Sequence, residues 1–349
     1  MPAPEVDVLV RGAGPAGCAA AAALRDAGLS VAVAQSGMPP PGFRPIALSH
    51  ASRLILERIG AWEPLAATPI VAIEVSQAGG FGRTRFDAAD AGVPALGYVV
   101  DYAALCRSLR VRVESLIAPE PVAARCVVHA EGIADAREKR YGQDALVALV
   151  ATAPEAAGTA FERFTAEGPL ALLPFAGRFA VVWALPPVRA RALAACAGQE
   201  FLAALSAAAG RRVGRALAVE ARAVQPIVLR VRRCRVAARE IYVGNAAQTL
   251  HPVAGQGLNV ALRDAWELAQ ALCGAPDPGD GALLARYAAS RRLDAGAAVR
   301  VTDMLARGFL GSSRIARAAR GAALTALDVL PGPRRFFARR MIFGPSALP

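Results

Sequence analysis

Lysine and histidine are scarce in this chain: Lys139 is its single lysine, and only three histidines occur among 349 residues. Cysteine motifs are absent as well. The six cysteines, none of which forms a C-x-x-C pair, are Cys18, Cys106, Cys126, Cys196, Cys234 and Cys273. This scatter argues against a zinc site and against a disulfide framework. We therefore expect the chain to work in a reducing, cytoplasmic compartment.

Long apolar runs are also absent, although 55% of the residues are hydrophobic. No run reaches the ~18 residues that a membrane-spanning helix needs. The N-terminus carries Glu5 and Asp7, where a signal peptide would carry basic residues. We expect a protein that is neither exported nor membrane-spanning, built as one large domain or two closely joined ones with ample core.

A first glycine-rich motif follows the first apolar stretch. Val6 to Val10 predicts a buried strand, and Gly12-Ala-Gly-Pro-Ala-Gly17 directly after it opens an alanine-rich helix. In such a motif Gly12 makes the tight turn, Gly14 lets a pyrophosphate approach the backbone, and Gly17 lets the helix pack on the strand. Ala16 belongs to the same predicted nucleotide site.

The next predicted strand, Val31 to Ala34, ends at Gln35, where this motif usually has Glu or Asp. That position binds the adenosine ribose. The amide of Gln35 can still bond the ribose, but its neutral hydrogen bonds are weaker than those of a carboxylate. We therefore expect the chain to retain its cofactor less tightly.

A second glycine-rich stretch lies between a short predicted strand at 241–243 and a helix predicted from Leu258 by the spacing of its apolar residues. Pro252 keeps the loop between them from becoming helix, and Gly255 and Gly257 leave the backbone bare, so a flat group can lie against it. The N-terminus of the helix favours negative charge, such as that of a reduced flavin ring.

This stretch resembles the second flavin motif of the flavin-dependent aromatic hydroxylases, G-D-A-A-H-x-x-x-P-x-x-G-x-G-x-N, in the form typical of the ubiquinone-biosynthesis branch. Asn245 stands where the family usually has Asp. The resemblance implies that the FAD-binding residues here are Gly244, Asn245, Pro252, Gly255, Gln256, Gly257, Leu258 and Asn259. His251, in the same loop, is interpreted as a structural residue, with an acid–base role as the alternative.

Two other segments extend the resemblance. Arg44-Pro-Ile-Ala-Leu-Ser49 matches the family's R-x-x-A-L-S segment, which implies that Arg44 lies near the adenosine and phosphate part of FAD; a plain loop before a helix is the alternative. Glu131-Gly132 replaces the family's Asp-Gly, which contacts the ribityl chain. The extra methylene of Glu131 can misplace its carboxylate in a tight site. The region 110–140 is also shorter than in the family, which implies missing strands.

The resemblance implies an α/β fold: a Rossmann-like FAD-binding domain with an inserted antiparallel β-sheet substrate domain and a C-terminal helical region, an aromatic-hydroxylase fold in shortened form. We predict a discontinuous FAD-binding domain at 1–140 and 226–280, a substrate-covering domain at 141–225 and a basic helical region at 281–349. Four β-runs are expected at Ala145–Ala151, Thr159–Thr165, Leu170–Phe175 and Phe179–Leu185. The candidates for lining an apolar pocket, with plain core as the alternative for each, are Leu172, Leu173, Phe175 and Trp183.

Positive charge is concentrated near the C-terminus. The net charge is +12, and Arg286 to Arg340 holds twelve arginines against three aspartates. Phenylalanine, leucine and methionine alternate with these arginines. We expect this region to contact an anionic membrane surface, peripherally on its inner face, or other ubiquinone-biosynthesis proteins. The alternative is that the apolar residues pack internally. Nucleic acid is not an expected partner because no recognition motif accompanies the charge.

The resemblance implies a FAD-dependent monooxygenase that hydroxylates the aromatic ring of a polyprenylated phenol in ubiquinone biosynthesis, using NAD(P)H and O2 through a flavin hydroperoxide. The chemistry would belong to the cofactor, so we assign no catalytic side chain and no metal. One alternative is a non-catalytic FAD- or lipid-binding scaffold subunit of a ubiquinone-biosynthesis complex. A nicotinamide dehydrogenase with a Rossmann fold would leave the second motif unexplained.

Overall fold

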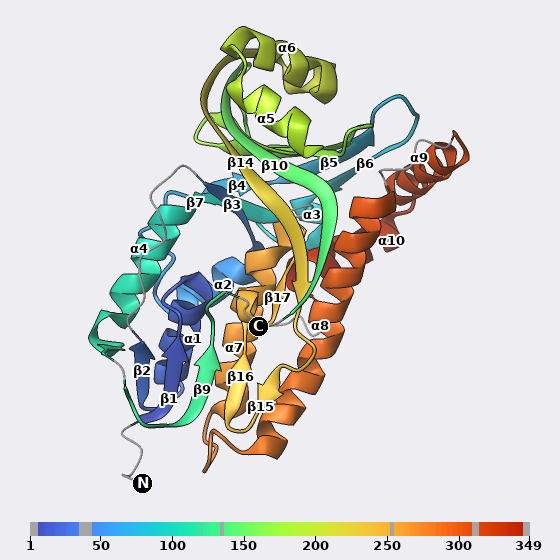
Figure 1. Ribbon diagram of the computed structural model, residues 1–349. Coiled ribbons are helices and arrows are strands. Elements are labelled where there is room, and N and C mark those ends of the chain that lie inside the picture. The colour runs from blue at the N-terminus through green and yellow to red at the C-terminus, as the bar shows by residue number, and fades with distance from the viewer. Residues whose placement is uncertain are drawn as a thin grey trace.

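The computed structural model describes residues 6–34, 44–119, 121–132, 136–251, 255–308 and 314–344. In Figure 1 a parallel sheet lies in the lower half of the molecule, a larger sheet lies above it, and the C-terminal helices run along one side. Two predicted cofactor contacts, Gln35 and Pro252, lie outside the described residues.

The parallel sheet forms from the short apolar runs of the sequence. Its strand order is β15-β16-β9-β1-β2-β8. The bounds are β1 Val6–Arg11, β2 Val31–Ala34, β8 Ile117–Ala118, β9 Ala124–His129, β15 Val236–Ala237 and β16 Glu240–Tyr242. β1 pairs in parallel with both β2 and β9, and only the edge pair of β15 and β16 is antiparallel among the described strands of this sheet. Central parallel strands are covered on both faces, which is why β1 and β2 are apolar without alternation.

Helices α1 (Pro15–Asp26), α4 (Tyr102–Val113) and α7 (Gln256–Leu272) pack with this sheet into the main hydrophobic core. The side chains of α1 that face its neighbours are mostly alanine and are almost fully buried. Small side chains let α1 lie close to both α4 and α7. The N-terminus of α7 is thereby brought beside that of α1.

The larger sheet is built around two strands of 17 residues each, β10 (Arg137–Ala153) and β14 (Arg215–Val231), which pair along their length. Its order is β17-β14-β10-β13-β12-β11-β5-β6. The other strands are β5 Ala72–Gln77, β6 Arg83–Asp87, β11 Thr159–Phe164, β12 Pro169–Phe175, β13 Arg178–Leu185 and β17 Gln248–Thr249. The four predicted β-runs are therefore confirmed. The sheet is antiparallel except between β11 and β5.

The two faces of this sheet are covered by different elements. Helices α5 (Pro187–Ala195) and α6 (Gly198–Ala209) cover the outer face, at the top of Figure 1. Leu172 and Trp183 belong to the core beneath these helices, so for them the core interpretation holds. Leu173 and Phe175 lie on the opposite, inner face, where they pack near Val99.

A three-stranded sheet lies beneath the inner face, with the order β3-β7-β4. Its strands are β3 Pro45–Ser49, β4 Thr68–Ile70 and β7 Gly97–Asp101. Helix α2 (His50–Arg58) follows β3, and Ser49 caps it by accepting a hydrogen bond from the backbone nitrogen of Ser52. The short helices are α3 Ala88–Ala91, η1 Glu114–Leu116, η2 Arg211–Val213 and η3 Gly244–Ala246.

Three helices end the chain: α8 Gly281–Gly308, α9 Arg314–Val329 and α10 Pro331–Phe343. α8 packs on α7, α9 packs on β6, and α10 contacts α3 and α2. In the part of the chain that the structure describes, no helix combines the length and apolarity needed to cross a membrane.

The N-terminal part of the chain contributes to more than one sheet. β5 and β6 come from within the segment 1–140 and complete the larger sheet. The division into FAD-binding segments 1–140 and 226–280 and a covering segment 141–225 remains a prediction.

Candidate functional site

Three strand ends meet at one edge of the parallel sheet. β9 runs parallel to both β1 and β16, so their C-terminal ends lie side by side. Gly12 follows β1, Glu131 and Gly132 follow β9, and Gly244 follows β16. A Cβ atom on Gly12 would lie only 2.6 Å from the backbone nitrogen of Glu131. The fold thus brings together motifs that lie far apart in the sequence.

The glycines at this edge are of two kinds. Gly12, at φ 105°, and Gly17 serve packing, because a Cβ on Gly17 would lie 1.8 Å from the carbonyl oxygen of Gly12. At Gly14, Gly132 and Gly257 an added Cβ would meet no non-neighbouring atom of the described residues within 4 Å. These three positions present bare backbone to open space, as the approach of a pyrophosphate or a flat ring requires. The residues present therefore fit FAD.

Two helices begin at the same edge. α1 starts after Gly14 and α7 after Gly255, and neither N-terminus has a side-chain cap within the described chain. Their first N–H groups are therefore oriented to stabilise negative charge. Gly244, at φ 56°, lies against both helices, since an added Cβ would lie 2.9 Å from the Cβ of Ala16 on α1 and 3.2 Å from the Cβ of Ala261 on α7. Ala16 and Gly244 thus pack closely here, and their contact with FAD remains a prediction.

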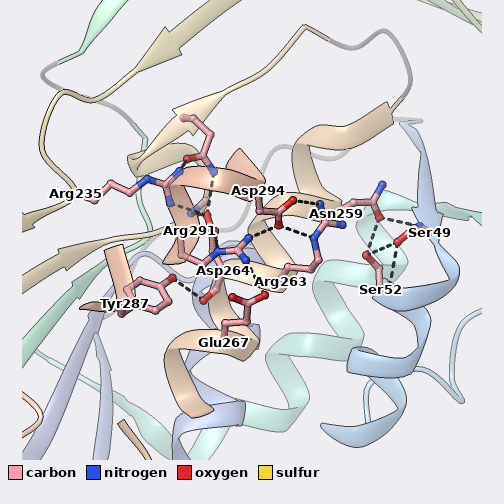
Figure 2. A network of polar contacts seen from close by, with 12 residues as sticks. Ser49, Ser52, Arg235, Asn259, Arg263, Asp264, Glu267, Tyr287, Arg291 and Asp294 are labelled. Atoms are coloured by element: carbon pink, nitrogen blue, oxygen red, sulfur yellow. Dashed lines mark hydrogen bonds and ion pairs between the residues drawn. The ribbon is translucent and has the colours of Figure 1, made fainter. Parts of the chain in front are cut away.

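Asn259 joins the start of α7 to β3 and α2 by hydrogen bonds. Its Nδ2 donates to the carbonyl oxygens of Ala47 (3.1 Å) and Gly255 (2.7 Å). Its Oδ1 accepts from the backbone nitrogen of Ser49 (2.8 Å) and from Oγ of Ser52 (2.7 Å), as Figure 2 shows in part. These four bonds use the full capacity of an amide. Asn259 thus holds the backbone at Gly255, directly before α7, in a fixed position relative to β3 and α2.

The other predicted contacts of the second motif are placed around this loop. Asn245 is exposed in η3, Gln256 is buried in the first turn of α7, and Leu258 is half-buried against the main core. Gly255 has φ 58°, and its Cβ would lie 3.4 Å from the Cβ of Ala47. The left-handed backbone at Gly255 explains why this position favours glycine.

Arg44 and Glu131 are both exposed. The guanidinium of Arg44 lies 4.7 Å from the ring centre of Tyr102, at the start of α4. The Glu131 side chain is 54% exposed, with Oε1 3.8 Å from Nδ1 of His129. The predicted contact of Arg44 with the adenosine part of FAD, and that of Glu131 and Gly132 with the ribityl chain, remain predictions.

A buried network of charges joins α7 to α8 and was not predicted from the sequence (Figure 2). Arg291 Nε donates to Asp264 Oδ1 at 2.8 Å, and Arg291 Nη1 lies 2.7 Å from Glu267 Oε1. Arg263 makes two hydrogen bonds to Asp294, of 2.8 and 3.1 Å. The sequence signal that could have revealed this network is the presence of two charged residues, Arg263 and Asp264, within the apolar face of the predicted helix.

The network reaches the flavin motif directly. Asp264 Oδ2 accepts a hydrogen bond from the side chain of Gln248 (2.9 Å) and a longer one from the backbone nitrogen of Gly244 (3.4 Å). Burial by itself would favour the neutral acid, but Arg291 and Arg235 hold the pKa of Asp264 below its usual range. Asp264 is therefore a buried anion on α7 that fixes the first half of the second motif, at Gly244 and Gln248.

His251 is completely buried beside the same loop. Its ring meets that of Tyr141 edge-on, with 4.9 Å between ring centres. Burial lowers the pKa of His251 to about 4, so the ring is neutral at pH 7. This supports the structural interpretation over an acid–base role.

Sequence comparison places this chain beside known flavoproteins. Residues 119–302 and 7–43 each match a family described as FAD binding domain. The chain is 32% identical to ubiquinone hydroxylase UbiL of Rhodospirillum rubrum over 380 aligned positions, covering 95% of this chain and 88% of the relative. It is 27% identical to 3-demethoxyubiquinol 3-hydroxylase of Escherichia coli, covering 82% of this chain and 86% of that protein.

Solved structures of similar shape are also FAD-dependent. The probable FAD-dependent monooxygenase pqsL of Pseudomonas aeruginosa superimposes with a TM-score of 0.72 at 23% identity, covering 91% of this chain and 99% of the other. HpxO of Klebsiella pneumoniae, in complex with FAD and uric acid, gives a TM-score of 0.73 at 17% identity, covering 95% and 97%. At such identities the likeness shows the fold alone.

Proposed function

The chain belongs to the FAD-dependent hydroxylases that include the ubiquinone hydroxylases, and we propose that it hydroxylates the aromatic ring of a polyprenylated phenol in ubiquinone biosynthesis. The predicted aromatic-hydroxylase fold is confirmed. The observation that carries the proposal is the identity to a ubiquinone hydroxylase over nearly the whole chain. Both sequence relatives named above are hydroxylases, which favours the enzyme over the scaffold alternative.

FAD is the cofactor, and when bound it supplies the redox chemistry between NAD(P)H and O2. The part of this chain is to bind and orient it. The open backbone at Gly14, Gly132 and Gly257 accepts the group, and the N-termini of α1 and α7 stabilise its negative charge. Asn259 joins the start of α7 to β3, and Asp264 joins α7 to Gly244.

The fit to FAD is tested by replacing Gly257 with Val. The branched side chain would fill the open space against the backbone, so we expect FAD affinity to fall at least 100-fold, measured by titrating the purified apoprotein and following flavin fluorescence. The matched control is Gly281→Val at the start of α8, where an added Cβ also meets open space. Unchanged FAD affinity in Gly257→Val would contradict the assignment of this loop.

The reaction is tested by reducing the bound flavin anaerobically with NADPH or NADH, with and without a short-chain prenylated phenol, and then admitting oxygen. We expect the phenol to accelerate reduction and to gain one oxygen atom, detected by mass spectrometry. A tightly bound flavin that both nucleotides leave oxidised would support the scaffold alternative instead.

The C-terminal helices support a peripheral membrane contact as part of this proposal. Four apolar side chains of α9, α10 and the residue between them are exposed: Ile315, Val329, Leu330 and Phe336. Arg335, Arg339 and Arg340 are exposed on α10 around Phe336. Other apolar residues of the same helices, Leu324, Ile342 and Phe343, are buried. We call the exposed residues Ile315, Val329, Leu330, Arg335, Phe336, Arg339 and Arg340 the basic apolar surface. Such a surface suits contact with an anionic lipid bilayer, from which a polyprenylated substrate is collected.

A further inference from the structure

One row of side chains crosses the inner face of the larger sheet and is only half-buried. Cross-strand pairing places Val147, Val182, Ala171, Glu162 and Val75 side by side on β10, β13, β12, β11 and β5. All five are of intermediate exposure. We call this row the inner strip, and Glu162 is its one charged member.

The rows on either side of the inner strip include more buried residues. In one row Leu149, Ala180 and Ala160 are buried while Leu173 and Ile73 are half-buried, and in the other Ala145 and Phe164 are buried. On the outer face, Leu146, Val181 and Leu172 are covered by the core beneath α5 and α6. The middle of the inner face is therefore the accessible, mainly apolar part of this sheet.

The inner strip lies on the side of the sheet that faces the candidate FAD site. Next to it, Leu173 packs near Ile70 and Val99 of the β3-β7-β4 sheet. In that sheet, Ala47 contacts the second flavin motif through Asn259. At the β10 end, Tyr141 packs near Val182 and meets the ring of His251. Elements that carry or hold the flavin motif thus border the strip at two places.

Glu162 stands apart from the charges of its neighbours. Its cross-strand partners on the inner face are Ala171 and Val75, which cannot form a hydrogen bond through their side chains. The adjacent charged residues, Arg163 and Glu74, alternate to the other face, where Glu74 pairs with Arg85 and Arg212. Burial raises the pKa of Glu162 to about 7. The carboxyl group therefore has acceptor capacity that the described residues do not use.

We propose that Glu162 accepts the hydrogen bond of the substrate's phenolic hydroxyl while the ring lies on the apolar part of the inner strip. This inference rests on the proposed function, because it assumes a phenol as substrate. A hydrogen bond from a phenol to a carboxylate is charge-assisted. It polarises the O–H bond and so makes the phenol ring richer in electrons. It would thereby fix the ring's orientation and favour electrophilic attack on it.

The inference predicts how the protein distinguishes a phenol from its methyl ether. A hydrogen bond to a charged group is worth about 1.5–3 kcal/mol, or roughly 10- to 100-fold in affinity. At pH 8, where a carboxyl group with a pKa of about 7 is mainly ionised, we expect the FAD-loaded wild type to bind a short-chain prenylated phenol that much more tightly than its O-methyl ether, measured by the change in flavin absorbance on titration. Glu162→Leu should abolish this preference, and Glu162→Gln should restore part of it through the amide oxygen.

The control is Glu220→Gln on β14, whose carboxylate pairs with Arg178 at the surface and which should keep the full preference. FAD affinity should be the same in all variants, because Glu162 does not belong to the cofactor edge. If the wild type hydroxylates the phenol but Glu162→Leu keeps the preference, the role of Glu162 is overturned and the proposed function stands. If the wild type neither binds nor hydroxylates the phenol, the proposed function fails and the inference fails with it.

Discussion

Single residues at the candidate site differ in whether they hold the fold or leave room for a ligand. Gly17 cannot accept a side chain because the carbonyl oxygen of Gly12 occupies its place, whereas Gly14 and Gly257 face open space. Asn259 resembles a ligand-binding residue by its motif, yet its four hydrogen bonds all go to the protein. The chemistry of a residue type therefore has to be interpreted together with the contacts it makes.

At the residue scale, His251 should make stability depend on pH. Its pKa falls from 6.5 to about 4 on burial, so between these values the unfolded chain binds more protons than the folded one. The neutral, buried ring therefore contributes to the free energy of unfolding. This contribution is fully present above pH 6.5 and decreases by about 3 kcal/mol in total as the pH falls towards 4.

The measurement is urea unfolding at pH 7, 5.5 and 4.5 for the wild type and for His251→Gln. We expect the variant to be less stable at pH 7 but to lose less stability on acidification than the wild type. Parallel curves for the two proteins would show that His251 does not titrate as its burial predicts.

At the scale of secondary-structure elements, the buried charges decide how α7 and α8 are joined. Arg291 neutralises Asp264 and Asp294, both of which are almost fully inaccessible. Removing one partner of such a group leaves uncompensated buried charge. Through the pairing of Arg291 with Asp264, α8 therefore stabilises the second flavin motif, although it contributes none of the predicted cofactor contacts.

Arg291→Met should reduce the free energy of unfolding by about 3–5 kcal/mol. It should also weaken FAD binding, because Asp264 bonds to Gly244 and Gln248 of the motif. Chemical denaturation and FAD titration measure the two effects. The control is Arg292→Met, the exposed neighbour on α8, for which we expect a change within about 0.5 kcal/mol. Equal effects of the two substitutions would argue against the network.

At the scale of the whole molecule, charge and apolar exposure occur together at the C-terminal helices. Part of the arginine excess is used internally, as at Arg291 and at Arg334, which pairs with Asp90 at 3.1 Å. Of the other arginines, Arg335, Arg339 and Arg340 are exposed on α10 with Phe336. The internal-packing interpretation holds for the buried apolar residues of these helices, and the membrane contact of the exposed ones remains a proposal.

We expect the protein to float with anionic liposomes, to remain unbound with neutral ones, and to be released by salt. Ile315→Ser combined with Phe336→Ser should reduce recovery several-fold, because the apolar contribution is lost. Leu293→Ser on α8 is the control, since Leu293 is 68% exposed but lies outside the basic apolar surface. Equal recovery with both lipids, unaffected by salt, would count against membrane docking.

The local features of this protein follow from short stretches of its sequence. Both glycine motifs, the strands that precede them and the helices that follow depend on turn chemistry and on the spacing of apolar residues over a few positions. The alternation of strand residues likewise predicted the four β-runs between 145 and 185. These features depend on neighbours in the chain, so they can be inferred without knowing the fold.

Tertiary structure alone decided which face each strand residue occupies and which distant residues meet. Adjacent Leu172 and Leu173 lie on opposite faces, and only the placement of α5 and α6 makes one of them core. The contact of Gly12 with Glu131 depends on strand order, and the row containing Glu162 depends on register across five strands. The pairing of Asp264 with Arg291 follows from the packing of α7 on α8. Such contacts are set by non-local packing, which local sequence patterns do not encode.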